Sequence, residues 1–465
     1  MEEKTTSSVQ HAAPDAKGAA SATGKSNPFR PTLGIFDMIV YGLISMVPIA
    51  PMAIYGEVFQ ASNGMPTLAY LIGFLAVLFS VWSFGIMIER FPSSGSIFTY
   101  ASHIMGPMMG FLTGWLMLLQ YLVSPTLVYI IAGTALHGLI PEIPIWVWCV
   151  VFLALVAFIS LRGMKATVKV NRAALVGELV VLFLFILFSV IYIATHDASQ
   201  ADLGKALVNP EEFKFSDMMS SVSLAVLSYV GFGAIATLTQ EAKHPRTGPA
   251  RAMMIMSIIL LVLFTVQCYL ATCVDPTGSS FKDNPDNGFY IVAQIAGGKW
   301  LSVACAVAVA LAQGLFTALV SQTSVSLIMF SMARGGSLPR KLGTLKKGTN
   351  LPLAATISVI VLSAVLIPIM LPLGVGTVAK VSNFGALATY GILNVCVITF
   401  CWFQQKSRSN VFRHLIAPLL GAIICFGIML SLNDIALRVG VIWIVIGLIY
   451  YCILKYGMHR DIKTL

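Results

Sequence analysis

The chain has 465 residues, of which 57% are hydrophobic and only 10% are charged, with a formal net charge of +10. Soluble globular domains usually carry about a quarter charged residues, so this composition excludes a soluble protein. Apolar runs of about 20 residues recur along nearly the whole chain, the length that a helix needs to cross a hydrocarbon core about 30 Å thick. The alternating segments of a membrane β-barrel are absent from the sequence. We therefore predict an all-α integral membrane protein.

Polar residues rich in Ala, Ser, Gly and Lys form the first 32 positions. They lack the short apolar core of a secretory signal, so we predict a disordered cytoplasmic tail and no cleaved peptide. Residues 456–465 are predicted to form a second cytoplasmic tail. Between the tails, the twelve candidate spans are 33–59, 67–89, 107–139, 144–161, 172–194, 217–239, 252–273, 300–332, 351–372, 376–403, 412–431 and 436–455.

Lysine and arginine are distributed unevenly over the loops between these spans. If the N-terminus is cytoplasmic, most of the 29 basic residues fall on the cytoplasmic side. Short loops with a Lys/Arg excess stay in the cytoplasm, so both termini are predicted inside, and the net charge reflects topology rather than a nucleic-acid partner. The eight cysteines mostly lie in apolar runs and form no CxxC pair, which favours packing over a disulfide framework or a metal site. No metal and no cofactor are predicted.

Spans one and six both contain helix-breaking residues near mid-membrane depth. Span one carries Pro48 and Pro51 in YGLISMVPIAPMAIYG, and span six carries Gly231 and Gly233 in LSYVGFGAIATL. Proline removes a backbone donor and glycine weakens a helix, and broken backbone within a bilayer is tolerated only where it is buried or lines a cavity. The two breaks occupy the first position of two five-helix halves, as in an inverted repeat with a binding site at the midplane. The alternative is a pair of unrelated kinks.

Four stretches of the sequence resemble amino acid–polyamine–organocation (APC) permeases. They are FPSSGSIFTYASHIMGPMMGFLTGWLMLLQY (91–121), SYVGFGAIATLTQEAKHPRTGPARA (228–252), SQTSVSLIMFSMARGGSLP (321–339) and VSNFGALATYGILNV (381–395). The similarity extends over about residues 33 to 455 and looks nearest to the bacterial putrescine-importer-like members. The resemblance implies the leucine-transporter-type fold, with five helices in 33–194, an inverted repeat of five in 217–403, and two further helices in 412–455.

The same resemblance implies that the substrate lies between the broken stretches of helices one and six, with help from helices three, eight and ten. The residues at these positions are Ser45, Met46, Val47, Pro48, Ile49, Ala50, Gln120, Tyr121, Tyr229, Val230, Gly231, Phe232, Gly233, Gln313 and Asn383. Further small polar residues that either contact the substrate or hold helices together are Thr317, Ser321, Thr323 and Ser382.

The sequence departs from the putrescine importers where those relatives carry acidic residues in helices one, three and six. The matching positions here are Ala53, Gln120 and Gly233. An unpaired buried charge costs roughly several kcal/mol, so a diamine without carboxylate partners is disfavoured. A neutral amino acid, a monoamine or an organic acid is favoured instead, and the uncharged Gln120 and Tyr121 suit such a ligand.

Two carboxylates and two aromatic residues are candidates for coupling and gating. Glu178 lies inside apolar span five, where some proton-coupled relatives have a lysine that takes the place of sodium, and it is either a proton carrier or a structural hydrogen-bonding group. Glu57, at the outer end of span one, either binds an ammonium group, gates the site, or is a solvated helix-end carboxylate. Tyr229 and Phe232 flank the break in span six and either gate the substrate, stack on an ammonium group by cation–π attraction, or pack in the core.

The sequence thus predicts a secondary transporter that imports a small amino acid or amine across the cytoplasmic membrane by alternating access, coupled to protons. An exchanger of an amino acid for its amine is the close alternative, followed by a transporter-like sensor that binds solute without moving it. A membrane enzyme is disfavoured because the sequence has no HExxH, GxSxG or P-loop motif. The predicted partners are the small-molecule substrate, a proton and the lipid bilayer.

Overall fold

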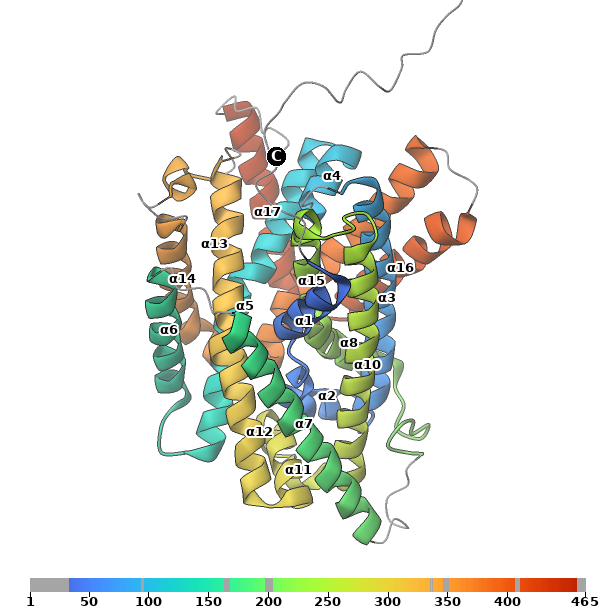
Figure 1. Cartoon of the computed structure of the whole chain (residues 1–465), viewed down its shortest axis with the longest axis vertical. Helices are drawn as coiled ribbons and strands as arrows, with labels where there is room; N and C mark the ends of the chain where they lie inside the picture. The colour runs from blue at the N-terminus through green and yellow to red at the C-terminus, as the bar shows by residue number, and fades with distance from the viewer. Residues whose placement is uncertain are drawn as a thin grey trace, which may run out of the picture.

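The computed structural model is a bundle of helices, most of which run along its long axis (Figure 1). It describes residues 33–92, 96–162, 168–196, 204–334, 336, 338–345, 351–405 and 410–457. The predicted N-terminal tail and nearly all of the C-terminal tail lie outside these ranges. Within them, β pairing is limited to one isolated bridge between Leu33 and Ala242.

The α-helices of the described chain fall in the following order. They are α1 (Ile35–Met46), α2 (Tyr55–Ala61), α3 (Pro66–Arg90), α4 (Ile97–Met105), α5 (Pro107–Leu139), α6 (Ile145–Leu161), α7 (Val168–Thr195), α8 (Phe215–Tyr229), α9 (Gly233–Thr237), α10 (Gly248–Val274), α11 (Gly288–Gly297), α12 (Lys299–Leu311), α13 (Ala318–Arg334), α14 (Leu353–Met370), α15 (Gly374–Ile398), α16 (Ala417–Leu430) and α17 (Asp434–Cys452). A π-helical turn, Ala312–Thr317, joins α12 to α13.

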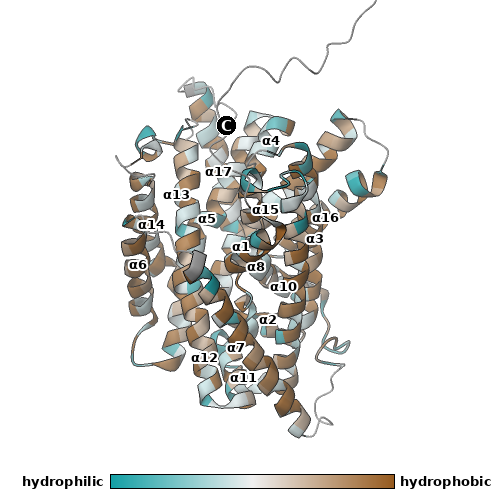
Figure 2. Ribbon diagram, in the orientation of Figure 1, coloured by the Kyte–Doolittle hydropathy of each residue, from teal (hydrophilic) through white to brown (hydrophobic). Residues whose placement is uncertain are grey.

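Ten helical segments within the described ranges are long and apolar enough to cross a membrane. One of them, Leu353–Gln404, contains both α14 and α15, which are separated by the turn Leu371–Leu373. The apolar helix α6 is shorter, at 17 residues. Apolar residues predominate along the peripheral helices α6, α7 and α14 (Figure 2), as a lipid-facing surface requires. The protein is a multi-pass membrane protein, and the count of twelve spans stays a prediction.

The first helix break lies between α1 and α2. Helix α1 ends at Met46, and Val47 follows with a φ of 56°, a left-handed value that strains a β-branched residue. Pro48 and Pro51 have no backbone N–H, so the helical hydrogen-bond ladder cannot continue through them. A 3-10 turn, Ala50–Ala53, then leads toward α2. The interruption expected from the two prolines is present.

The second break lies between α8 and α9, and it touches the first. Helix α8 ends at Tyr229, and α9 begins at Gly233. Gly231 between them has a φ of 131°, a value that glycine adopts far more readily than other residues. A Cβ atom on Gly231 would lie 3.1 Å from the Cγ atom of Met46. The two breaks therefore meet in the middle of the bundle.

The remaining helices hold the two broken ones in place. Helix α5 is the most buried of the long segments, and it packs against α4, α6, α12, α13 and α15. Helix α3 packs against α8, α10 and α16. Figure 1 shows α1 and α8 between these groups, with α6, α13 and α14 on one side and α3, α10 and α16 on the other. The breaks are thus enclosed by helices, as broken backbone within a bilayer must be.

Candidate functional site

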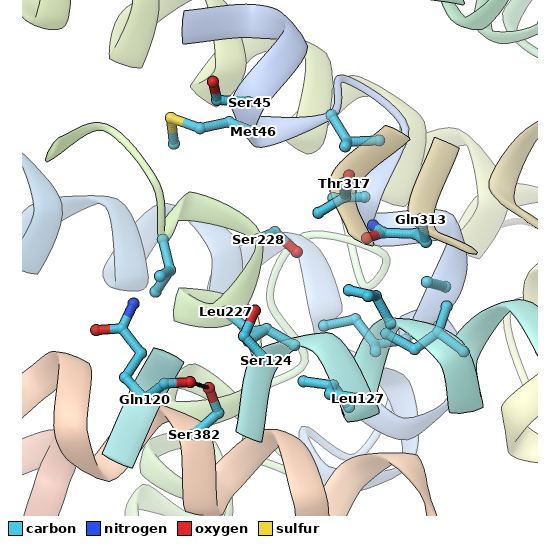
Figure 3. A pocket seen from close by; sticks show the side chains of 17 residues that line it. Ser45, Met46, Gln120, Ser124, Leu127, Leu227, Ser228, Gln313, Thr317 and Ser382 are labelled. Carbon is cyan, nitrogen blue, oxygen red and sulfur yellow. Dashed lines mark hydrogen bonds between the residues drawn. The ribbon is translucent and has the colours of Figure 1, made fainter. Parts of the chain in front are cut away.

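A pocket lies beside the two breaks and contains about 600 Å³ of space free of protein atoms, including the part open to solvent. Its 17 lining residues are Ser45, Met46, Val47, Ala50, Ala53, Ile54, Gln120, Ser124, Leu127, Val128, Ile131, Leu227, Ser228, Val230, Gln313, Thr317 and Ser382. They come from both broken segments, from α5 and α15, and from the π-helical turn Ala312–Thr317. Figure 3 shows these side chains converging on the cavity.

The pocket wall is uncharged, because none of the 17 lining residues is acidic, basic or a histidine. Four of its seven polar side chains have protein partners. The hydroxyl of Ser45 donates to the carbonyl oxygen of Tyr41 at 2.9 Å, Ser124 accepts from Ser321 at 2.9 Å, Ser228 pairs with the hydroxyl of Tyr70 at 3.1 Å, and Ser382 lies 3.5 Å from the carbonyl oxygen of Gln120. The side chains of Gln120, Gln313 and Thr317 have no hydrogen-bond partner among the described residues. The amides of Gln120 and Gln313 are therefore available to a ligand, whereas the Oγ1 atom of Thr317 is unpaired but buried.

About half of the residues predicted to bind substrate line this pocket. Those on the wall are Ser45, Met46, Val47, Ala50, Gln120, Val230 and Gln313. Those that the wall does not include are Pro48, Ile49, Tyr121, Tyr229, Gly231, Phe232, Gly233 and Asn383. Most of the second group still belong to the broken segments, whose backbone shapes the pocket.

The two aromatic gate candidates are fully buried in aromatic clusters. The hydroxyl of Tyr229 donates to the carbonyl oxygen of Tyr70 at 3.2 Å, and its ring packs against Tyr70 and Phe264. Phe232 packs edge-to-face against Phe84 and also contacts Tyr390. In this conformation both residues pack in the core, the second of the two interpretations considered for them. Their part in gating stays a prediction.

The sequence prediction missed several wall residues, some of which a simple pattern reveals. Ser124, Leu127, Val128 and Ile131 follow Gln120 on α5 at helical spacing, so one face of this helix lines the pocket. Once Gln120 is a candidate, positions four, seven, eight and eleven residues later become candidates too. Three other missed residues, Ile54, Leu227 and Ser228, had no comparable signal in the sequence.

Glu178 is buried in α7, away from the pocket wall, with 6% of its surface exposed. Its Oε2 atom has no hydrogen-bond partner among the described residues. The helix packs against α1, α10, α11 and α12. Nearer its start, Arg172 lies 3.7 Å from Asp37 of α1. Glu178 is thus a carboxyl group inside an apolar helix that contacts the first broken segment.

A cluster of charged residues lies at the α2 side of the pocket; we call Glu57, Asp286 and Lys380 the α2-side cluster. The carboxyl groups of Glu57 and Asp286 are within hydrogen-bonding reach of each other. Glu57 is packed against α15, because a Cβ atom on Gly376 would lie 2.6 Å from its Oε2 atom. The ammonium group of Lys380 donates to Ser220 of α8 at 3.0 Å and interacts electrostatically with Glu57. Burial raises the pKa of Asp286, and its hydrogen bond with Glu57 opposes part of this rise.

The described residues contain no group of three or more His, Cys, Asp or Glu side chains that could hold a metal ion. Two interrupted helices that meet beside a pocket, within a bundle of helices long and apolar enough to cross a membrane, are typical of membrane transport proteins. Comparison with known proteins identifies the family within this class.

The chain belongs to the amino acid permease family, whose model matches residues 37–461. It is 28% identical over 437 residues to a low-affinity putrescine importer of Escherichia coli, covering 92% of this chain and 94% of the relative. It is 23% identical to a branched-chain amino acid permease of Bacillus subtilis, covering 93% and 94% of the two chains. It is 22% identical to the methylthioribose transporter of the same species, covering 93% and 95%. The family lies in the APC superfamily that the sequence resembles, so the predicted resemblance is confirmed.

Proposed function

We propose that this protein imports a small amino acid or amine across the cytoplasmic membrane by alternating access, with the N-terminus in the cytoplasm. The observation that carries the proposal is the contact between the two helix breaks beside the uncharged pocket. We further propose that residues 33–194 and 217–403 form two inverted five-helix repeats of the leucine-transporter type, with 412–455 forming two added helices. In such proteins the substrate site lies at the interface of the repeats.

The backbone at the breaks supplies charge complementarity that the side chains lack. The C-terminal end of a helix carries a partial negative charge, and its N-terminal end carries a partial positive charge. Helix α1 ends at Met46 and α8 ends at Tyr229, whereas α9 begins at Gly233. An amino group is therefore expected near the C-terminal ends of α1 and α8. This arrangement accommodates an amino group without a charged side chain in the wall.

Glu178 is the proposed proton carrier. A carboxyl group inside a membrane helix is costly when ionised, and such residues commonly mark proton relays. Its burial and its unpaired Oε2 atom favour a role in proton binding over a structural hydrogen bond. Helix α7 contacts α1, so a change of charge at Glu178 can influence the first broken segment. Transport coupled to one proton gains about 1.4 kcal/mol, or tenfold accumulation, for each unit of pH difference.

The α2-side cluster is the proposed outer gate. It joins α2, the segment before α11, and α15 through Glu57, Asp286 and Lys380, and Lys380 extends the link to α8 through Ser220. Opening this side separates the neighbouring carboxyl groups of Glu57 and Asp286. In Figure 1 α11 lies near the end of the bundle opposite α4, and α2 lies between α1 and that end, which is the external side under the proposed orientation.

Uptake into proteoliposomes tests this proposal. Purified protein is reconstituted and presented with radiolabelled amino acids and amines, with and without an inward proton gradient. Accumulation that depends on the gradient supports proton-coupled import. Uptake that requires internal solute and ignores the gradient supports the exchanger instead. Binding of a solute without any flux under either condition contradicts the transport proposal and favours a sensor.

A further inference from the structure

The π-helical turn Ala312–Thr317 places two polar side chains on the pocket wall. Such turns are rare within α-helices and occur frequently at functional sites. Gln313 and Thr317 both line the pocket from this turn. Gly314 fixes the turn against its neighbours, because a Cβ atom there would lie 2.6 Å from the Cβ atom of Ala132 and 2.8 Å from the Cδ1 atom of Phe152. The backbone that carries Gln313 and Thr317 is therefore closely packed against neighbouring helices.

Both residues carry a polar side chain without a hydrogen-bond partner among the described residues, and the hydroxyl of Thr317 is also buried. Gln313 is 7% exposed and forms no side-chain hydrogen bond, and the Oγ1 atom of Thr317 is buried and unpaired. Thr323, less than two turns further along, shows the usual arrangement, with its hydroxyl donating to the carbonyl oxygen of Leu319 at 2.7 Å. Buried polar groups are normally paired, and those left unpaired call for an explanation. A ligand in the pocket supplies that explanation.

Gln313 and Thr317 lie apart from Gln120, the other pocket amide without a hydrogen-bond partner among the described residues. Figure 3 shows Gln313 and Thr317 together on one wall, and Gln120 beside Ser382 on the opposite side of the cavity. Between the two sides, α5 presents the apolar residues Leu127, Val128 and Ile131 to the pocket. The wall around Gln313 and Thr317 is thus apolar apart from neutral hydrogen-bonding groups. An ionic group placed there has no opposite charge to compensate its loss of hydration.

We propose that Gln313 and Thr317 form a subsite that binds the uncharged hydrogen-bonding side chain of a neutral amino acid. The subsite offers an amide carbonyl, an amide NH₂ and a hydroxyl, which together complement an amide or hydroxyl group of the solute. Solutes with a second cationic group, such as diamines, are excluded because the wall holds no carboxylate. This inference rests on the proposed transport function and names its substrate class.

The test is competition for uptake, with thermal shift as a second measurement that does not require flux. Glutamine, serine, leucine and putrescine are compared on the wild type and on the variants Gln313→Leu, Thr317→Val and Thr323→Val. We expect glutamine or serine to bind best and putrescine to have no effect. Gln313→Leu and Thr317→Val should each weaken the polar solute roughly tenfold while leaving leucine nearly unchanged. Thr323→Val is the matched control and should retain the wild-type ranking.

A further variant tests the inference by changing which class of solute the subsite prefers. Gln313→Glu places a carboxylate in the subsite, so it should lower the preference for neutral solutes and raise that for solutes with a second amino group. The inference is overturned if the wild type takes up putrescine as well as neutral amino acids, or if both subsite variants keep the ranking of Thr323→Val. If no amino acid or amine is bound or moved, the proposed function itself fails. Melting temperatures of the variants identify any that do not fold.

Discussion

Replacing Glu178 by glutamine is expected to uncouple transport from the proton gradient. The substitution keeps the shape of the side chain and its capacity for hydrogen bonds but removes the titratable proton. Since Glu178 is 6% exposed and its Oε2 atom has no partner among the described residues, the amide fits without breaking an ion pair. A gradient of one pH unit drives about tenfold accumulation through one coupled proton, so the variant should fall to about onefold. Exchange of labelled for unlabelled solute across the membrane should persist.

The assay compares gradient-driven uptake and equilibrium exchange in the same proteoliposomes. Glu142→Gln is the matched control, because this carboxylate is exposed in the loop between α5 and α6. It should behave like the wild type in both measurements. Full gradient-driven accumulation by Glu178→Gln would refute the proton role and leave a structural hydrogen bond as the explanation. Loss of both uptake and exchange, with an unchanged melting temperature, would also contradict a role confined to coupling.

Three further substitutions probe other parts of the structure. Gly231→Ala places a side chain at a φ of 131°, which should lower the melting temperature and the free energy of unfolding by about 1–3 kcal/mol. Burial raises the pKa of Asp286 in the closed α2-side cluster, so proton binding stabilises closure at low pH, and this stabilisation is lost as pH rises through the raised pKa. External accessibility of the pocket should therefore increase with pH, and Asp286→Asn should reduce this dependence; unchanged pH dependence would contradict it. Arg172→Ala breaks an exposed ion pair to Asp37 and should change the free energy of unfolding by less than about 1 kcal/mol. A larger loss of stability would contradict this small contribution.

The helix breaks could be predicted from the sequence because their causes are local. Pro48 and Pro51 cannot donate to a helical ladder wherever they lie, and Gly231 permits a backbone conformation that other residues resist. Long apolar runs likewise specify membrane spans without reference to their neighbours. The contact between Gly231 and Met46 depends on tertiary packing. It could be expected because the two breaks occupy corresponding positions in the two predicted five-helix halves.

The details of the pocket depend on which way each side chain turns, and local sequence does not determine this. Tyr229 and Phe232 flank the break as predicted but pack into aromatic clusters, because neighbouring helices offer rings at the right distance. Asp286 and Lys380 join Glu57 only through the fold, since they are 229 and 323 positions away from it in the chain. The unpaired state of Thr317 could not be inferred either, because it depends on the π-helical turn.

The most direct test of the central claim is whether the pocket is accessible from one side of the membrane at a time. In a background with the exposed Cys452 replaced by serine, Ser124→Cys places a thiol on the pocket wall, and Ser257→Cys, in the buried face of α10, serves as a buried control. Membrane-impermeant thiol reagents are applied to either side of oriented vesicles, with and without solute. The account predicts that the cysteine at position 124 reacts from one side at a time, that solute protects it, and that the control stays unreactive. Simultaneous labelling from both sides, or no labelling from either, would contradict an alternating-access site between the two broken helices.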